Sequence, residues 1–202
     1  MVTIEHRGSM IGVFLDTETN GLNPRKHSIF EIAYKMIDLR DGKEIFSFHT
    51  VVKHPKEVFD CSDPSSLEIN GFTFDEIQKG IEVSEVNRLI VQSFEKHNIV
   101  RKKAVFICQN PSFDRAFFSS IIPIIEQEKM QLPYHWLDLA SMYWAISIFL
   151  KQEDKFPWKT GISKDQIASS MNLEEEPIPH RAQNGTNHLV QCYEKLVGYP
   201  QA

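Results

Sequence analysis

The sequence predicts a mixed α/β fold, with helices packed on the faces of one mixed sheet. Two observations support this prediction. The first fifty residues hold three strand-like segments separated by turn signals, and the later residues alternate short apolar segments with helix-spaced ones. An antiparallel meander followed by alternating strands and helices is typical of such a fold. The length of 202 residues, with 42% hydrophobic and 24% charged residues, fits one globular domain.

The first three strands are expected at residues 11–16, 29–39 and 43–52. Asn20-Gly21 marks a turn after the first strand. Asp41-Gly42 is a strong hairpin signal between the second and the third. The three strands should therefore pair in antiparallel order. Residues 1–10 are polar and expected to fray, which leaves 11–198 as a single domain.

Helices and strands alternate in the rest of the chain. The wholly apolar segment 104–108 is typical of a strand buried on both faces. Asn110-Pro111 resembles an N-cap followed by a proline in the first helical turn. Helices are expected from residue 63, over 83–97, from 111 to about 129, near 139–150 and 163–171, and from 181 to before 198, with a short strand near 135–137.

Two acids stand where the first strand ends. Asp16 and Glu18 are two residues apart, so on an extended chain their side chains point to the same face. Carboxylates held that close repel each other, and a divalent cation removes the conflict. Oxygen ligands suit Mg²⁺ or Mn²⁺. The alternative is a pair of solvated acids at a strand end.

Two further positions could join this pair. Asp114 lies in the first turn of a helix that leaves a buried strand, where an acid could also serve only the helix dipole. His180 stands just before the last helix, after Pro177 and Pro179. An imidazole can act as a general base at neutral pH, although a lone histidine at a helix start is often incidental.

Together these sites resemble the motifs of the DEDDh 3′–5′ exonucleases. Members of this family include the proofreading ε subunit of bacterial DNA polymerase III, RNase T and oligoribonuclease. The matching segments, in the order of the family, are Leu15-Asp16-Thr17-Glu18-Thr19-Asn20-Gly21-Leu22, Asn110-Pro111-Ser112-Phe113-Asp114 and His180-Arg181-Ala182. Asp138 falls where the family often has an Asp-Thr-Leu segment and is interpreted as structural.

The resemblance implies a ribonuclease H-like fold, with a five-stranded mixed sheet flanked by helices. It also implies two divalent cations, Mg²⁺ or Mn²⁺, that hydrolyse the terminal phosphodiester of DNA or RNA. Asp16 would bridge both cations, Glu18 would bind one, and Asp114 would act through water. His180 would deprotonate the attacking water. The family also implies substrate contacts at a further set of positions, which are Thr17, Thr19, Leu22, Asn110 and Phe113. Of these, Phe113 also fits a core stripe with Phe117 and Ile121.

One position departs from the family pattern. The fourth metal-binding acid is expected five residues after His180, where this chain has Gly185. Gly185 shares a helix face with Leu189, Cys192 and Leu196, so a side chain there would point toward the sheet. The glycine could reflect close packing, a natural loss of activity or an introduced substitution. Neither His188 nor Asn184 is on the right side to replace the missing acid.

The sequence therefore predicts an impaired 3′–5′ exonuclease. The alternative is an inactive module that binds a nucleic-acid end or a partner. The formal net charge of −5 argues against coating of long nucleic acid, but not against binding of one 3′ end. The expected partners are a single-stranded DNA or RNA 3′ end, and a polymerase or a second copy. No membrane segment is expected. The three cysteines are interpreted as reduced core residues of a cytoplasmic protein.

Overall fold

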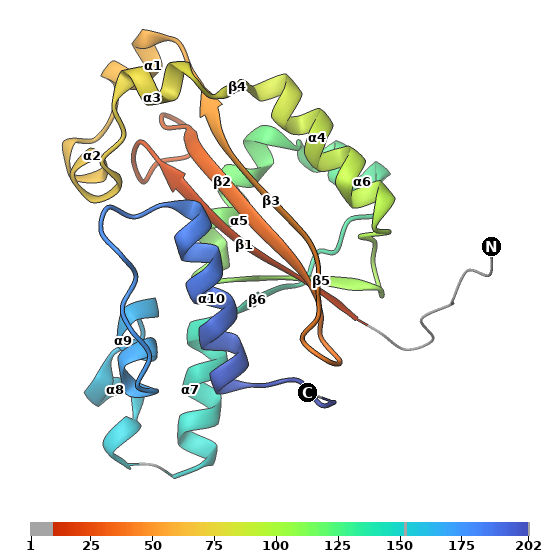
Figure 1. The fold of residues 1–202 in the computed structure, drawn as a ribbon, viewed down its shortest axis with the longest axis vertical. Helices are drawn as coiled ribbons and strands as arrows, with labels where there is room; N and C mark the ends of the chain where they lie inside the picture. The colour runs from red at the N-terminus through yellow and green to blue at the C-terminus, as the bar shows by residue number, and fades with distance from the viewer. Residues whose placement is uncertain (1–9, 152, 202) are drawn as a thin grey trace.

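The computed structural model describes residues 10–151 and 153–201, which form a three-layer α/β structure (Figure 1). Its six-stranded sheet has the order β4-β3-β2-β1-β5-β6. The first three strands are antiparallel, whereas β4, β5 and β6 pair in parallel with β3, β1 and β5. The strands are β1 (Ile11–Thr19), β2 (Ile29–Asp38), β3 (Glu44–Lys53), β4 (Ile81–Glu82), β5 (Ala104–Cys108) and β6 (Trp136–Asp138). The predicted mixed sheet is confirmed, with the two-residue β4 added to the five strands expected.

The predicted helices are present, although the boundaries of some differ. The described helices are α1 (Lys56–Asp60), α2 (Pro64–Asn70), α3 (Phe74–Gln78), α4 (Val83–Lys96), α5 (Pro111–Ile121), α6 (Ile124–Lys129), α7 (Leu139–Phe149), α8 (Pro157–Thr160), α9 (Lys164–Ser170) and α10 (Ala182–Leu196), with the 3-10 turn η1 (Glu153–Lys155). The helix expected from 111 to 129 is two helices, because Pro123 lacks an N–H and its ring cannot continue the helix.

Asn110 and Asp138 are the N-cap residues of α5 and α7, but only the Asp138 side chain makes capping bonds. Asn110 occupies the N-cap position of α5 and Pro111 follows it in the first turn, as predicted, but Asn110 adopts a left-handed φ of 57° and its side chain makes no capping bond. Its Oδ1 instead accepts a hydrogen bond from Ser112 Oγ at 2.6 Å. Asp138 accepts bonds from Ala140 N and Ser141 N at the start of α7, which confirms its structural role. It also accepts a bond from Asn110 N at 3.1 Å.

The two faces of the sheet bury separate apolar cores. Val13 and Leu15 of β1 pack with residues of α4 and α5, whereas Phe14 packs with residues of α7, α9 and α10. This alternation follows from the two-residue period of a strand. Phe113, Phe117 and Ile121 contribute to the first core, as the alternative interpretation of that stripe predicts. Because β1 is a central strand, its carboxyl end lies between α5 on one face and α10 on the other.

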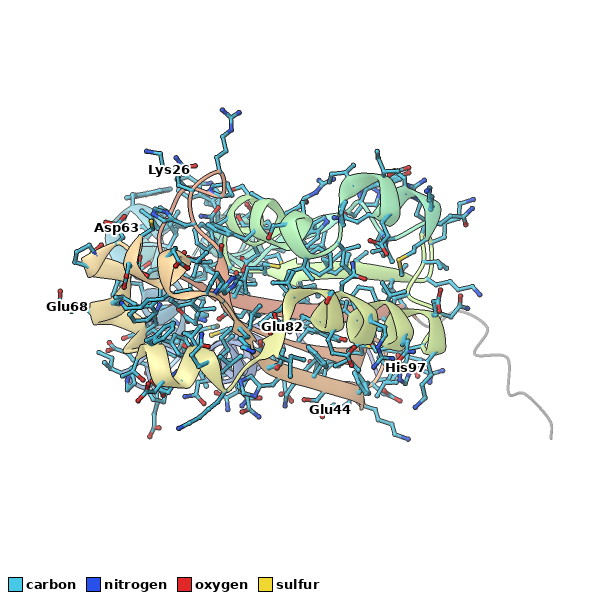
Figure 2. The ribbon with its side chains drawn as sticks, turned by 90° about the horizontal axis from the view of Figure 1, so that it is seen from above. Lys26, Glu44, Asp63, Glu68, Glu82 and His97 are labelled. Carbon is cyan, nitrogen blue, oxygen red and sulfur yellow. The ribbon has the colours of Figure 1, made fainter. Side chains whose placement is uncertain are left out.

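A small third hydrophobic cluster lies near the carboxyl end of β1. Phe30, Phe72 and Ile77 of α3 form this cluster, and Phe59 of α1 and Leu67 of α2 pack against it. Seen from above, labelled charged side chains such as Lys26 and Glu68 project from the outside of the molecule (Figure 2). Of the three cysteines, Cys108 and Cys192 are buried but Cys61 is exposed, so the core interpretation is wrong for Cys61.

Two expectations concern the ends of the chain and membranes. The frayed terminus expected at residues 1–10 falls, except for Met10, outside the described residues. Within residues 10–151 and 153–201, no helix has both the length and the apolar character needed to cross a bilayer.

Candidate functional site

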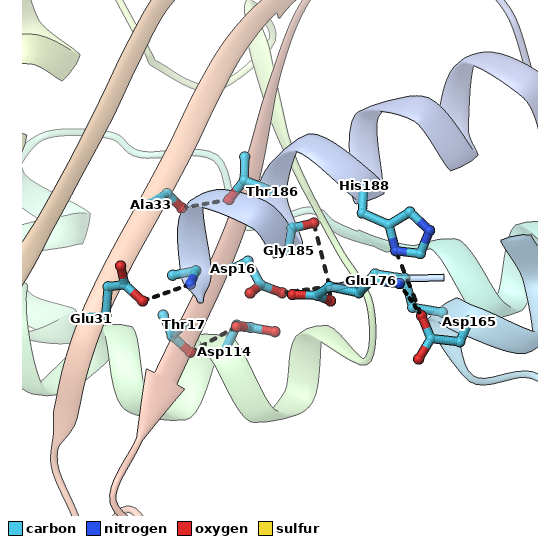
Figure 3. Close-up of polar contacts among 12 residues, drawn as sticks. Asp16, Thr17, Glu31, Ala33, Asp114, Asp165, Glu176, Gly185, Thr186 and His188 are labelled. Atoms are coloured by element: carbon cyan, nitrogen blue, oxygen red, sulfur yellow. Dashed lines mark hydrogen bonds and ion pairs between the residues drawn. The ribbon is translucent and has the colours of Figure 1, made fainter. Parts of the chain in front are cut away.

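The acids of β1 face the first turns of α10, as the strand period predicts. In the sheet, Asp16 lies opposite Ala33 and Glu18 lies opposite Glu31 of β2. A Cβ placed on Gly185 of α10 would lie 2.2 Å from Asp16 Oδ2. The close-up shows Asp16 directly below the backbone of Gly185 (Figure 3). The end of β1 and the start of α10 therefore form two walls of one site.

Asp114 approaches this site from α5. Its side chain is buried, with 4% of the residue exposed, and its Oδ1 accepts a hydrogen bond from Thr17 Oγ1 at 2.8 Å. Thr17 lies between Asp16 and Glu18 in sequence, so this bond fixes Asp114 to the strand that carries the other two acids. The interpretation of Asp114 as a mere dipole partner does not account for this long-range buried contact.

His180 lies beside the acids, just before α10. Its backbone N donates to Ile69 O at 3.1 Å. A ring nitrogen of His180 and carboxylate oxygens of Glu18 and Glu176 all lie within 4.8 Å of one another. The structure thus brings His180 to the same end of β1 as Asp16, Glu18 and Asp114. It also adds Glu176, which the sequence analysis did not predict.

Two anchors hold the segment that contains His180. Glu31 of β2 is buried, and its Oε2 accepts a bond from Ala182 N at 2.8 Å. This bond satisfies one of the free N–H groups at the start of α10. Arg181 pairs with Glu76 at 3.0 Å, and its guanidinium lies 3.9 Å from the centre of the Phe72 ring. These contacts position the segment before α10 over the end of the sheet.

Gly185 faces the site, which confirms the predicted orientation of this helix position. The Cβ that would lie 2.2 Å from Asp16 Oδ2 would also lie 2.9 Å from Lys164 Nζ. Such distances are far below van der Waals contact, so a larger residue would require Asp16 and Lys164 to move. The glycine thus leaves space for the ends of these two side chains, and position 185 supplies no ligand. His188 does not replace it, since its Nε2 donates to Glu174 O at 2.9 Å.

Lys164 brings a positive charge into the acidic site. Its Nζ lies 3.3 Å from Asp16 Oδ1, 3.3 Å from Gly185 O and 2.7 Å from Glu176 Oε2. The sequence offered little signal for either new residue. Lys164 is one lysine at the start of a short helix, and Glu176 ends an acidic run, Glu174-Glu175-Glu176, that resembles a solvated surface.

Burial and like charges make the carboxylates of this site resist ionisation. Burial, followed by the charges of Asp16 and Glu176, raises the pKa of Glu18 to about 9. Burial and the neighbouring Asp16 also raise the pKa of Asp114. The pKa of Asp16 is raised by burial, although the Lys164 ammonium opposes this rise. Burial lowers the pKa of Lys164, but Asp16 and Glu176 outweigh it and raise that pKa above its ordinary value. A bound cation would relieve the repulsion among these acids.

The residues expected to contact substrate have different surroundings. Leu22 is 74% exposed beyond the end of β1, and Asn110 is exposed as well. Thr17 and Thr19 are buried, and Thr19 Oγ1 donates to Gly21 O at 2.8 Å. Phe113 is half-buried, with its ring centre 4.8 Å from that of Phe117. Substrate contact at these five positions stays a prediction.

Comparison with known sequences identifies the kind of domain. Residues 13–183 match the family model described as an exonuclease. The PolC-type DNA polymerase III of Thermotoga petrophila is 26% identical over 122 residues. That match covers 60% of this chain and only 8% of the polymerase.

Solved structures with a similar fold include two nucleases. Escherichia coli exonuclease I in complex with a dT13 oligonucleotide has a TM-score of 0.72 and 16% identity, over 95% of this chain and 42% of that one. The nuclease domain of 3′hExo, a DEDDh family member bound to rAMP, has a TM-score of 0.64 and 12% identity, over 94% and 92% of the two chains. The chain thus spans less than half of exonuclease I. These similarities confirm the predicted fold.

Proposed function

Because the chain belongs to the exonuclease family, we propose that it hydrolyses the terminal phosphodiester at the 3′ end of DNA or RNA. The observation that carries this proposal is the position of Asp16, Glu18 and Asp114 at the end of β1, with His180 beside them. The nucleotide ligands of the similar structures support it. Exonuclease I was solved with dT13, and 3′hExo with rAMP. The ligand proposed here is a single-stranded 3′ end.

In this proposal His180 takes the proton of the attacking water. The water oxygen bonds to the terminal phosphorus, and the 3′ oxygen of the preceding nucleotide leaves and is protonated. His180 suits this role because it belongs to the segment anchored by Arg181 and lies at the edge of the acidic site. Glu31 positions the histidine through its bond to Ala182 N.

Members of the exonuclease family generally use divalent cations, and the residues of this site fit one such ion. Carboxylate oxygens of Glu18 and Glu176 lie within 4.8 Å of each other and of a ring nitrogen of His180, so the two acids could hold an ion beside the histidine. Glu176 Oε1 is buried and has no hydrogen-bond partner among the described residues. A bound Mg²⁺ or Mn²⁺ would stabilise negative charge on the phosphate and make water more acidic. The second predicted cation fits less well, because Lys164 stands beside Asp16.

Reduced activity is part of the proposal. Position 185 supplies no carboxylate, so the ligand set differs from the four acids of the family pattern. The ion pair between Asp16 and Lys164 also favours the alternative, a module that binds a 3′ end without cleaving it. The two functions differ in one result, which is whether a bound oligonucleotide is shortened. The similarity to a PolC-type polymerase supports a polymerase as the protein partner to test first.

The test uses single-stranded DNA and RNA labelled at the 5′ end, with Mg²⁺ or Mn²⁺. We expect slow stepwise shortening from the 3′ end. His180→Ala should lower the rate by about 10²- to 10⁴-fold, the usual contribution of a general base. Asp16→Asn should also abolish most activity. His135→Ala, at an exposed histidine on the loop before β6, is the matched control and should cleave like the natural chain.

Two results would contradict the proposed function. One is that both oligonucleotides stay intact with either cation, while the protein binds their 3′ ends. That outcome would establish the binding module instead. The other is cleavage that persists unchanged in both His180→Ala and Asp16→Asn, because the activity would then arise outside this site.

A further inference from the structure

The position beside Asp16 is filled by a residue of the chain itself. Lys164 Nζ has three oxygen neighbours, Asp16 Oδ1, Gly185 O and Glu176 Oε2, at 3.3, 3.3 and 2.7 Å. An ammonium has three donors, so this environment matches its capacity. The Lys164 side chain is only 12% exposed. It therefore holds a fixed positive charge inside the acidic site.

The position of Lys164 in its helix is unfavourable for a positive charge. Lys164 is the first residue of α9, where the helix dipole favours acids and disfavours a cation. Its contacts with Asp16 and Glu176 explain the exception. The space that it uses exists because position 185 is glycine, since a Cβ there would lie 2.9 Å from Nζ. Gly185 and Lys164 are thus two parts of one arrangement.

Glu176 brings a carboxylate from outside the three sequence motifs. Its side chain is 2% exposed, with Oε2 paired to Lys164 and Oε1 unpaired among the described residues. Glu176 is held in place, because its backbone N donates to Asp165 Oδ1 at 2.9 Å. The preceding segment is held too, by the bond from His188 Nε2 to Glu174 O. A buried carboxylate oxygen without a partner among the described residues, close to Glu18 and His180, is suited to bind a cation.

We propose that Glu176 replaces the absent fourth acid and that the Lys164 ammonium takes the place of one divalent ion. The chain then binds a single Mg²⁺ or Mn²⁺, held by Glu18 and Glu176 next to His180. A second divalent ion beside Asp16 is disfavoured, because the ammonium already occupies that side and repels it. This inference deepens the proposed function and rests on it only in treating the acidic site as a cation site.

The experiment counts Mn²⁺ ions bound by the intact chain without nucleic acid, by calorimetry and electron paramagnetic resonance. The natural chain should bind one ion. Lys164→Met should bind two, because Asp16 loses its ammonium and the repulsion is removed. Glu176→Gln should weaken the single ion at least about tenfold, as expected for loss of one ligating carboxylate. Glu175→Gln, at the exposed neighbouring position, is the matched control and should bind like the natural chain.

Three outcomes would overturn the inference. They are two ions in the natural chain, one ion in both the natural chain and Lys164→Met, or unchanged affinity in Glu176→Gln. Circular dichroism checks that each variant is folded. If Glu176→Gln does not fold, the number of ions bound by Lys164→Met tests the inference alone. Because no substrate is present, a chain that cleaves nothing can still pass this test, so failure of the proposed function is recognised separately.

Discussion

At the scale of single residues, Gly185 decides how closely α10 approaches β1. The helix backbone lies against the Asp16 carboxylate, with no room for a Cβ. The sequence predicts the direction in which position 185 points, because helix periodicity places it on the face of Leu189 and Cys192. It could not predict Lys164, since nothing in the spacing connects residue 164 with residue 16. Contacts of that kind depend on the tertiary fold.

Gly185→Ala should therefore destabilise the chain, although alanine favours helices. The better helix propensity contributes about 0.5–1 kcal/mol. The added methyl must displace the short Asp16 side chain and the Lys164 ammonium, and such overpacking costs about 1–3 kcal/mol. We expect a net loss of about 1 kcal/mol in the free energy of unfolding, measured in urea. Asn184→Ala, one position earlier in α10, is the control and should be neutral or slightly stabilising. A stabilised Gly185→Ala would show that Asp16 moves aside freely.

At the scale of elements, the predicted strands and most helices are confirmed, because they rest on local patterns. The apolar segment over 104–108, the Asp41-Gly42 hairpin and the helix spacing of 83–97 are such patterns. The helix expected to reach residue 129 ends at Ile121 instead, where Pro123 prevents its continuation. The short helices α1, α3 and α8 were not predicted. Each has too few residues for apolar periodicity to be visible.

The start of α10 depends on an acid from a different element. Glu31 of β2 accepts the Ala182 N–H and also pairs with His49 of β3. Glu31→Ala should lower the free energy of unfolding by about 1–3 kcal/mol, because a buried N–H loses its partner. Glu44→Ala is the matched control on the same sheet. Its surface ion pair with Lys35 should contribute at most about 1 kcal/mol.

Glu31→Ala should also slow cleavage, because His180 lies two residues before Ala182 and would lose its fixed position. Chemical denaturation measures the first effect, and the 3′-end assay on the folded variant measures the second. If Glu31→Ala matches Glu44→Ala in both measurements, Glu31 does not anchor this helix.

At the scale of the whole molecule, three layers bring chemically important residues to one place from distant parts of the chain. β1 supplies two acids and α5 a third, whereas Lys164 comes from the first turn of α9, and Glu176 and His180 come from the segment between α9 and α10. Sequence motifs could indicate the acids and the histidine, since their order matches the family. They could not indicate how charge is balanced among them. That charge balance depends on the tertiary fold, which brings the first residues of different helices close together.

At the same scale, the contribution of His54 to the stability of the fold should decrease in acid, whereas the raised pKa of Glu18 acts in the opposite direction. His54 follows β3, and its Nε2 donates to Ile29 O at 2.8 Å, close to the Phe30 ring. Burial lowers the pKa of His54 below 6.5, although the bond to Ile29 opposes this. The unfolded chain therefore binds more protons than the folded chain as the pH falls through about 6.5. The His54 contribution is fully present above that pH and decreases below it.

His54→Gln should reduce this acid sensitivity, because glutamine can still donate to Ile29 O but does not titrate. The measurement is the free energy of unfolding of both proteins from pH 8 to pH 5, by urea denaturation. Other buried groups, including Glu18, titrate identically in both, so the difference between the two curves isolates His54. We expect a constant difference above about pH 7 and a variant that gains relative to the natural chain below about pH 6.5, the ordinary pKa of histidine. Parallel curves over the whole range would show that His54 binds protons equally in the folded and unfolded states.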